Sequence, residues 1–360
     1  VNFALRLVPV TYYVNDAATV GDIYCSDVGA PENNGLSPVT PTDSLKSILD
    51  LYDIEAGDRI LLDTGYYPLA DTTRVLANDS GALSQPVQIV GSTNWLYDGT
   101  VMDRQSTNKG SLSISDSALD FQSVSNVILS YVTVQNANNA ITGFRPISLT
   151  ISNALIRDGG IAGISMSLGN SVRVRNTVIT RMMSGGASFS QMSPSIDSCI
   201  IWSNGGSALS IGNGSAVVSN SILHADSTSF CYDLSNARIY GDYNNLYFVG
   251  QAYPARYNET LKPTLILEGL PQWTEFSTQD LYSVSVDPLF ADASADDYHP
   301  RSPFGRFDRS LGTFVMTDTN LSYLVDGGPP AFAYDQEPEP NRGRRNMGIY
   351  GNTLEASMGY

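Results

Sequence analysis

The sequence predicts an all-β fold, a right-handed parallel β-helix with an N-terminal amphipathic helix as one cap and a loop-rich C-terminal cap. Three observations support this prediction. Short β-branched runs recur with a period of about 22 residues, Gly, Asn and Ser separate these runs, and an Asn or Ser returns at one position of each repeat. Strands this short are unstable alone, so neighbouring coils must complete their hydrogen bonds.

A repeat through the middle of the chain decides the fold class. Five segments beginning at residues 124, 151, 174, 196 and 218 share apolar residues around one polar position, with successive spacings of 27, 23, 22 and 22 residues. The polar positions are Asn126, Asn153, Asn176, Ser198 and Asn220, and Asn244 continues the series in a looser match. Asn suits a stacked turn because its amide can bond the next coil and its backbone tolerates the left-handed conformation. A leucine-rich repeat does not fit, since its L-x-x-L-x-L framework is absent.

We expect a single solenoid domain made of three segments. Residues 1–120 hold an N-terminal strand, a helical cap and the first coils, residues 121–248 the regular coils, and residues 249–360 a long excursion and the C-terminal cap. The repeat is strongest in the middle segment and fades from about residue 241, which sets the second boundary.

The helical cap is predicted from apolar residues at helical spacing between Leu45 and Tyr52. Asp43 and Ser44 precede this run, and either side chain suits an N-cap. We expect the helix to end at Gly57. Such a helix would cover the open end of the solenoid, where an unpaired strand edge invites uncontrolled pairing.

Composition narrows the function classes. The chain has 36 acidic and 20 basic residues, a net charge of −16, which argues against nucleic-acid binding and against adsorption to an anionic membrane. No run of 18 uncharged apolar residues predicts a membrane span. Acidity and only three lysines are typical of a secreted or cell-surface protein. The three cysteines allow at most one disulfide, such as Cys199–Cys231, and without a Cys/His cluster no zinc site is expected.

Both ends of the chain resemble the ends of known right-handed parallel β-helix modules. The opening of such modules is similar to residues 12–16, 34–38, 56–58 and 63–65, and their closing end to residues 286–290, 298–302 and 341–351. Those modules occur in large secreted proteins of planctomycete- and verrucomicrobium-like bacteria and share the superfold of pectate lyases. The resemblance implies a fold rather than an activity, because many such modules have no assigned function.

Enzymes with this superfold often act on acidic polysaccharides, and their motifs can be sought directly. A lyase needs a base and a cation that neutralises the uronate carboxylate, and a hydrolase needs facing carboxylates. The sequence lacks the Asp-Asp pair with Arg-x-Lys of polygalacturonases, the clustered aspartates of pectate lyases and the Asp-Pro-His of C-5 epimerases. These absences count against the well-characterised catalytic families.

One column of polar and aromatic residues remains as a candidate binding surface. It follows the recurring Asn or Ser by four or five residues, and stacked coils would bring its members about 4.8 Å apart. The candidate residues are Arg157, Asp158, Arg181, Trp202, His224 and Asp226. Trp offers a face on which a sugar stacks, Arg binds carboxylate or sulfate, and His moves a proton. The alternative is a solvent-exposed column of turn residues without a ligand.

An acidic loop near the C-terminus is a candidate calcium site, since Ca²⁺ prefers carboxylate and carbonyl oxygens. Its residues are Asp287, Asp292, Asp296 and Asp297. The loop has no EF-hand spacing, and solvated loop acids are the favoured alternative.

Two classes of function fit the sequence. The favoured one is a non-catalytic extracellular module, a structural or adhesive unit of a surface protein or fibre with a glycan-facing surface as an option. The alternative is a polysaccharide lyase or another carbohydrate-active enzyme acting on an acidic polysaccharide, so the question of catalysis stays open. Apolar residues alternate through residues 1–10, and this strand would pair head-to-tail with another copy of the chain or pack on its own helix.

Overall fold

The computed structural model describes residues 8–94, 96, 99–106 and 116–360 of the 360. Most of the expected strand at residues 1–10 lies outside this range, so head-to-tail pairing through it stays a prediction. Of that segment, Val10 donates its backbone N–H to Asp58 and accepts the N–H of Arg59. No helix in the described part of the chain is both long and apolar enough to cross a bilayer.

The chain forms two compact units, residues 1–174 with 179–194, and residues 175–178 with 195–360. Each is built from parallel coils, which confirms the predicted fold class. The expected three-part division of a single domain stays a prediction.

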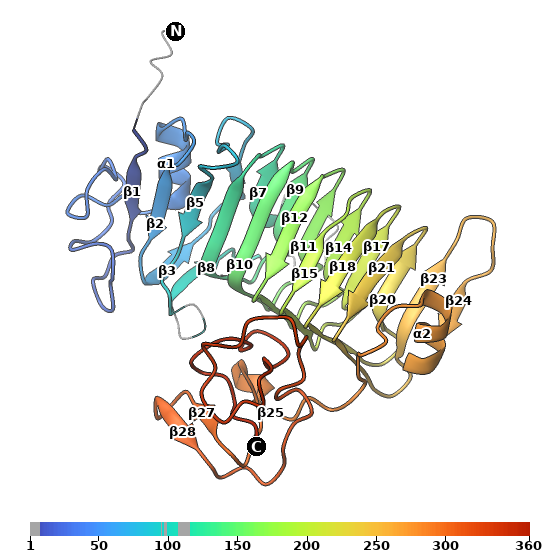
Figure 1. Cartoon of the computed structure of the whole chain (residues 1–360). Helices are drawn as coiled ribbons and strands as arrows, with labels where there is room; N and C mark the ends of the chain where they lie inside the picture. Colours follow the sequence, from blue (N-terminus) through green and yellow to red (C-terminus); the bar gives the residue numbers. More distant parts are fainter. Residues whose placement is uncertain (1–7, 95, 97–98, 107–115) are drawn as a thin grey trace. The chain divides into compact units, whose positions relative to one another are not determined.

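The first unit contains one helix and the strands of the N-terminal half (Figure 1). They are β1 (Thr11–Val14), α1 (Leu45–Leu51), β2 (Arg59–Leu62), β3 (Gly65–Pro68), β4 (Thr73–Val75), β5 (Val87–Val90), β6 (Thr100–Asp103), β7 (Ser117–Gln122), β8 (Val127–Gln135), β9 (Asn139–Phe144), β10 (Ser148–Arg157), β11 (Ala162–Ser167) and β14 (Gly185–Ser190). Two further strands, β12 (Ser171–Arg175) and β13 (Val178–Thr180), each have residues assigned to both units. One sheet pairs β1-β2-β5-β8-β10 in parallel, and a second sheet pairs β4-β7-β9-β11-β14.

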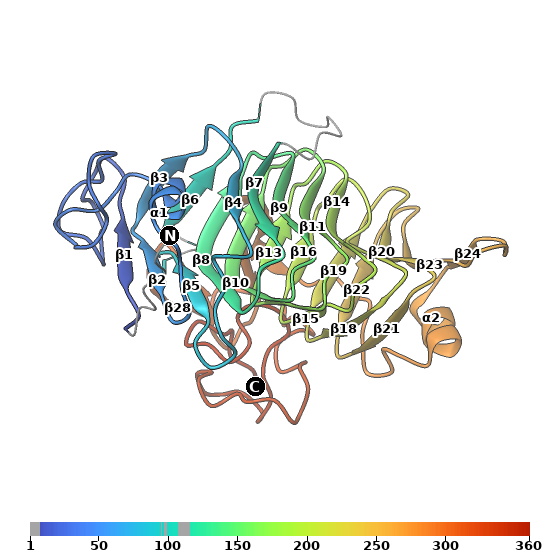
Figure 2. The ribbon, with the colours of Figure 1, turned by 90° about the horizontal axis from the view of Figure 1, so that it is seen from above.

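The second unit continues the same architecture. Its elements are β15 (Ser195–Asp197), β16 (Ile200–Trp202), β17 (Leu209–Gly212), β18 (Ser215–Ser219), β19 (Ile222–Ala225), β20 (Phe230–Ser235), β21 (Arg238–Asp242), β22 (Asn245–Phe248), β23 (Tyr253–Asn258), β24 (Leu265–Leu267), α2 (Leu270–Ser277), β25 (Phe290–Asp292), a 3₁₀ turn (Ala293–Ala295), β26 (Asp297–Pro300), β27 (Arg306–Asp308) and β28 (Thr313–Val315). Three parallel ladders, β15-β18-β21, β16-β19-β22 and β17-β20-β23, form its coils (Figure 2).

The core of each coil is built from inward-facing apolar residues stacked in register. In the second sheet of the first unit, Leu119 pairs with Ile141 and Ile141 with Ile164, and all three are fully buried. Because successive side chains in a strand alternate between faces, the residues on either side of this row point outward. The same register therefore stacks a buried apolar row and, next to it, a polar row of Asp120, Thr142 and Ser165 that is half-buried or buried.

The helical cap is confirmed. Ser44 is the N-cap and its hydroxyl accepts the N–H of Ser47, while Leu45 and Ile48 are buried. The helix ends earlier than expected, at Leu51, because Tyr52 adopts an extended conformation well before Gly57.

The register corrects the predicted alignment of the first coil. Ser152 pairs with Ser130 and Ala154 with Val132, so Asn153 lies opposite Tyr131 and not Asn126. Tyr131 has a left-handed φ of 61° and Asn153 one of 52°. The spacing of this step is thus 22 residues, and Asn126, although also left-handed, belongs to the turn before β8.

The second unit repeats this turn at Asn176, Ser198 and Asn220, with φ of 46°, 55° and 51°. The next position is Tyr243, with φ 55°, rather than Asn244, because Asn245 pairs with Ile222. Left-handed backbone at each coil is thus tolerated by Asn, Ser and Tyr alike, because the inter-coil hydrogen bonds fix the turn.

The C-terminal segment contains more regular structure than expected. The predicted excursion from residue 249 begins with another rung, since β23 pairs in parallel with β20. The following residues fold over the coils of the second unit. Arg345 donates to the hydroxyl of Ser198, Gly348 donates its N–H to the carbonyl of Asn220, and Asn220 donates to the carbonyl of Asn346.

The three cysteines are free thiols, so the Cys199–Cys231 disulfide does not form in this structure. Cys199 and Cys231 are buried, and burial raises the pKa of both thiols. Buried, protonated thiols of this kind are inert and serve as small apolar core residues.

Replacing Asn220 with Ala should destabilise the second unit by about 2–3 kcal/mol. The variant loses the hydrogen bonds from the buried amide to Ser198 and to the carbonyl of Asn346, and it places Ala at a φ of 51°. Asn213→Ala is a matched control, because Asn213 has the same φ but is exposed, and it should cost about 1 kcal/mol. Equal losses in chemical denaturation would contradict this account of the turn.

Candidate functional site

Two residues of the predicted column form an aromatic stack within the second unit. Trp202 at the end of β16 lies on His224 of β19, with ring centroids 4.2 Å apart, and His224 lies 5.5 Å from Tyr247 of β22. Phe290 packs edge-on against the Trp202 ring at 4.9 Å. His224 is 6% exposed and Trp202 is half-buried. Rings of this chain therefore occupy the faces on which a sugar was expected to stack.

The imidazole of His224 is held neutral. Its Nδ1 accepts the backbone N–H of Ser203 at 3.2 Å, and burial lowers its pKa against the opposing influence of Asp226 and Asp287. Asp226 itself belongs to a tight turn, where its backbone N–H and carbonyl both bond the hydroxyl of Ser229. His224, the one residue of the column that was predicted to carry a proton, is therefore buried and held in place by its neighbours.

The charged members of the column form a separate cluster in the first unit. The guanidinium of Arg181 donates to both carboxylate oxygens of Asp158, at 2.7 and 3.2 Å. The Nε of Arg157 donates to Gln135 at 3.0 Å and lies 3.6 Å from Asp158. Asp158 therefore pairs with Arg181, and Gln135 and Asp158 hold Arg157, so both arginines that were expected to bind an acidic ligand have partners within the protein.

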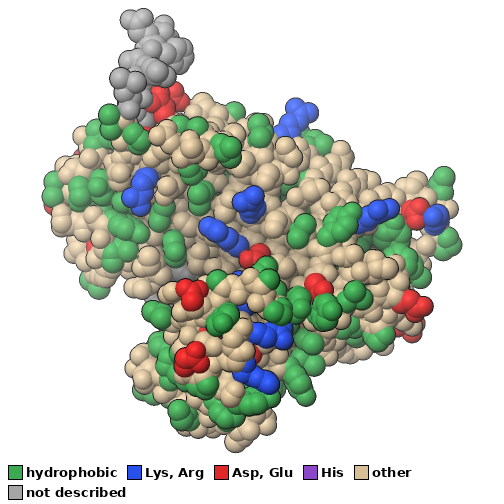
Figure 3. All heavy atoms as spheres, viewed as in Figure 1, with side chains coloured by type: hydrophobic (Ala, Val, Ile, Leu, Met, Phe, Trp, Pro, Cys, Tyr) green, Lys and Arg blue, Asp and Glu red, His purple; other side chains and the backbone are tan. Residues whose placement is uncertain are grey.

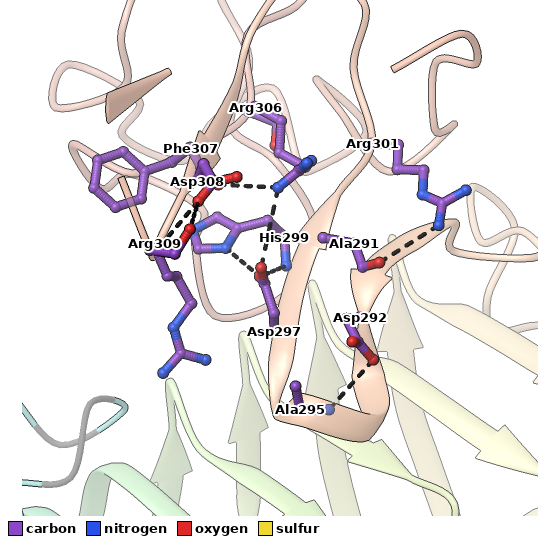
Figure 4. A network of polar contacts seen from close by, with 12 residues as sticks. Ala291, Asp292, Ala295, Asp297, His299, Arg301, Arg306, Phe307, Asp308 and Arg309 are labelled. Atoms are coloured by element: carbon purple, nitrogen blue, oxygen red, sulfur yellow. Dashed lines mark hydrogen bonds and ion pairs between the residues drawn. The ribbon is translucent and has the colours of Figure 1, made fainter. Parts of the chain in front are cut away.

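The carboxylates of the acidic loop bond to separate partners and do not converge on one point (Figure 4). Asp292 accepts the N–H groups of Ser294 and Ala295, Asp297 faces His299 at 2.6 Å, and Asp296 accepts the hydroxyl of Tyr298. Asp287 bonds the N–H of Leu289. Within the described ranges no three acidic, His or Cys side chains come together as a metal site. Calcium binding here remains a prediction.

A groove of about 400 Å³ lies instead on the outer face of the second sheet of the first unit. Parallel register produces two rows across β7, β9, β11 and β14. One row is Asp120, Thr142, Ser165 and Ser188, and the other is Gln122, Phe144, Ser167 and Ser190. We call this the hydroxyl groove. Its floor carries hydroxyl groups at successive rungs, and a phenyl ring that is 40% exposed borders it.

Charge in the hydroxyl groove is confined to one end. Arg74 of β4 lies 3.8 Å from Asp120, and its side chain is 58% exposed. Asp120 also accepts hydrogen bonds from Gln122 at 2.7 Å and from Thr142 at 3.0 Å. Arg74 and Asp120 are the charged side chains among the described residues that line the groove. The site therefore combines neutral donors and acceptors, one ion pair and one aromatic face.

In the second unit, polar side chains form a similar registered row across β17, β20 and β23. Ser210 of β17 pairs with Asp233 of β20, and Asp233 with Arg256 of β23. Arg256 donates two hydrogen bonds to Asp233, and its guanidinium lies 4.7 Å over the ring of Phe230. Charged side chains are also sparse elsewhere, as the face drawn in Figure 3 shows.

Sequence reasoning missed the hydroxyl groove although a signal was present. A polar–apolar–polar triplet recurs with the period of the coils, as Ser165-Met-Ser167 and Ser188-Phe-Ser190 show. Following this second repeat, rather than only the recurring Asn, would have placed these hydroxyls in register on one face.

Comparisons with known proteins support the fold. No protein-family model matches the chain. No curated protein matches its sequence. The structure, in contrast, is similar to solved structures. The pectate lyase Pel9A is 14% identical in sequence, with a TM-score of 0.52 over 95% of this chain and 96% of the lyase. A rhamnogalacturonan lyase is 12% identical, with a TM-score of 0.39 over 66% of this chain and 68% of its own. A lacto-N-biosidase from Eubacterium ramulus is also 12% identical, with a TM-score of 0.39 over 69% of this chain and 59% of its own. The likeness to Pel9A confirms a pectate lyase-like parallel β-helix.

The buried His224 should make stability depend on pH. Because burial lowers its pKa in the folded chain, the unfolded chain binds a proton first as the pH falls below 6.5. The contribution of His224 to the free energy of unfolding is therefore complete above pH 6.5. It declines as the pH falls toward the lower pKa of His224 in the folded chain. We expect the Tm difference between the wild type and His224→Leu to shrink between about pH 8 and pH 5. A constant difference would contradict a neutral buried imidazole; all other titrating groups are common to both proteins.

Proposed function

We propose that the chain binds a polysaccharide along the hydroxyl groove. The observation that carries the proposal is the pair of registered rows, in which half-buried serines stand at two successive rungs beside the exposed ring of Phe144. These serines are Ser165, Ser167, Ser188 and Ser190. Sugars offer hydroxyl groups that pair with such donors and acceptors, and C–H faces that pack on aromatic rings. Because the rows repeat, they suit a linear polymer better than a compact ligand.

Other ligand classes fit the hydroxyl groove less well. A nucleic acid requires a basic surface, and this chain has a net charge of −16 with one arginine in the groove. An apolar ligand would bring no hydrogen-bond partner to the hydroxyls of Ser165 and Ser188, which costs free energy. Fold-level analogy to the pectate lyase Pel9A adds to the proposal without carrying it. Binding without turnover is compatible with the adhesive role expected from the sequence.

Polysaccharide lyase activity is the second candidate, and Arg74 is the observation that favours it. Its exposed guanidinium beside Asp120 is suited to neutralising a uronate carboxylate at the end of the groove. A lyase also needs a base, and Arg74 is the basic side chain among the described residues lining this groove. One residue would then have to serve both roles, so binding is the better-supported function.

Replacing Phe144 with Ala should weaken polysaccharide binding about tenfold, because the groove loses its aromatic face. Ile147→Ala is the matched control, since Ile147 is also apolar and 52% exposed but lies outside the groove. Affinity electrophoresis against a panel of neutral and acidic polysaccharides measures both variants. Equal retention of the two variants on every polymer would place the binding surface elsewhere.

The lyase candidate has its own test. If Arg74 takes part in elimination, wild-type protein should release unsaturated uronate ends from an acidic polysaccharide, detected by ultraviolet absorbance, and Arg74→Ala should abolish their release. We expect no product from the wild type if the hydroxyl groove only binds. Release that persists in Arg74→Ala would remove the groove from the reaction.

A further inference from the structure

A cavity of about 750 Å³ lies within the second unit, between the turn after β21, the loop after α2 and the C-terminal segment. We call it the cap pocket. The residues that define its chemistry are Tyr243, Tyr282, Asp326, Arg342, Arg344 and Tyr360. None of these residues belongs to the hydroxyl groove, and they come from parts of the chain far apart in sequence.

Tyrosine rings form one wall of the cap pocket. Tyr243 and Tyr282 stack with centroids 5.3 Å apart and planes inclined by 12°. Both backbone N–H groups donate to the same carboxylate oxygen of Asp242, at 2.9 and 2.6 Å, which fixes the pair. The Tyr282 ring is nevertheless 65% exposed. A rigid aromatic face therefore remains open to a ligand.

The two arginines of the pocket are used differently. Arg344 donates to the carbonyl oxygens of Gly327 and Gly328, so its hydrogen bonds hold the loop. Arg342 is exposed, and its guanidinium lies 4.0 Å from the centroid of the Tyr360 ring. Within the described part of the chain, Arg342 has no hydrogen bond or ion pair. Its donors are thus available beside an aromatic ring that holds the side chain in place.

A buried carboxyl completes the cap pocket. Asp326 is 7% exposed, and its Oδ1 has no hydrogen-bond partner among the described residues. Burial raises the pKa of Asp326 to about 6, while Arg342 and Arg344 act to lower it and Glu339 to raise it. Asp326 lines the cap pocket, and its carboxyl places a titrating charge beside the space that a ligand would occupy.

We propose that the cap pocket binds an acidic sugar residue. The sugar face would pack on Tyr282, and the carboxylate or sulfate of the sugar would pair with Arg342. A neutral sugar would leave Arg342 unpaired. This site is distinct from the hydroxyl groove and does not depend on polysaccharide binding there.

Isothermal titration with glucuronate and with glucose tests the assignment. Wild-type protein should bind glucuronate measurably more tightly than glucose, and Arg342→Gln should weaken glucuronate about tenfold. Arg238→Gln is the matched control, because Arg238 is an exposed arginine of β21 outside the pocket, and it should bind like the wild type. Tyr282→Ala, at an exposed position, should also weaken binding. Equal affinity for glucuronate and glucose, or an Arg342→Gln variant that binds like the wild type, would overturn the proposal.

The buried carboxyl gives a second readout. As the pH falls from about 7 to about 5, Asp326 takes up a proton and no longer repels the ligand carboxylate, so glucuronate should bind more tightly. Glu337 interacts electrostatically with Asp326, and burial raises the pKa of Glu337 to about 7, so it titrates over the same range. Asp326→Asn removes the charge nearest the ligand, so the pH dependence of its affinity should be smaller than that of the wild type. An unchanged pH dependence in this variant would overturn the role of Asp326.

The two proposals fail separately. Phe144→Ala should lose polymer retention and still bind glucuronate, since Phe144 belongs to the first unit and to the hydroxyl groove. Loss of glucuronate binding in Phe144→Ala would mean that the acidic sugar occupies the groove and not the cap pocket.

Discussion

The parallel register between successive coils is the constraint on which the rest of the structure depends. Each strand is too short to be stable alone, so its backbone groups must find partners on the coil before and the coil after. One-to-one pairing keeps every turn at the same place in each coil, which is why Tyr131 and Asn153 share a left-handed backbone although their side chains differ. The pairing also stacks each inward residue on its equivalent, as with Leu119, Ile141 and Ile164.

This dependence explains why the fold was predictable while two positions of the predicted series, Asn126 and Asn244, were wrong. The period is written in many residues at once, so a single misleading segment does not hide it. The segment from Val124 to Leu129 matches the later ones in pattern, yet β8 begins only at Val127 and its turn falls at Tyr131. An aromatic residue at a left-handed turn gives no local signal, because its conformation is imposed by the neighbouring coil. Tyr243 is also an aromatic residue at a left-handed turn, so this turn has no local signal in the sequence either.

The candidate sites were less predictable because they depend on contacts without a period. Trp202 and His224 do lie on consecutive rungs, as their spacing indicated, but Phe290 from the C-terminal segment packs on the Trp202 ring. The serines of the hydroxyl groove do recur with the period of the coils. Because Ser is also common in turns, its alternation with apolar residues is a weak signal of a binding surface. The cap pocket had no such signal, since loops distant in sequence bring Tyr282, Asp326 and Arg342 together.

The hydroxyl groove and the cap pocket differ in how their charged side chains are paired. Arg181 is paired with Asp158 and Arg256 with Asp233, so each of these half-buried cations on the outer faces of the coils has a carboxylate partner. The faces are left with hydroxyls and rings, which recognise sugars by hydrogen bonding and packing rather than by charge. Arg342 differs because an aromatic ring, and not a carboxylate, holds its guanidinium. The two proposed sites therefore differ in the ligand that each would favour: the cap pocket offers a positive charge to an anion, and the hydroxyl groove offers neutral donors and acceptors to an uncharged stretch of polymer.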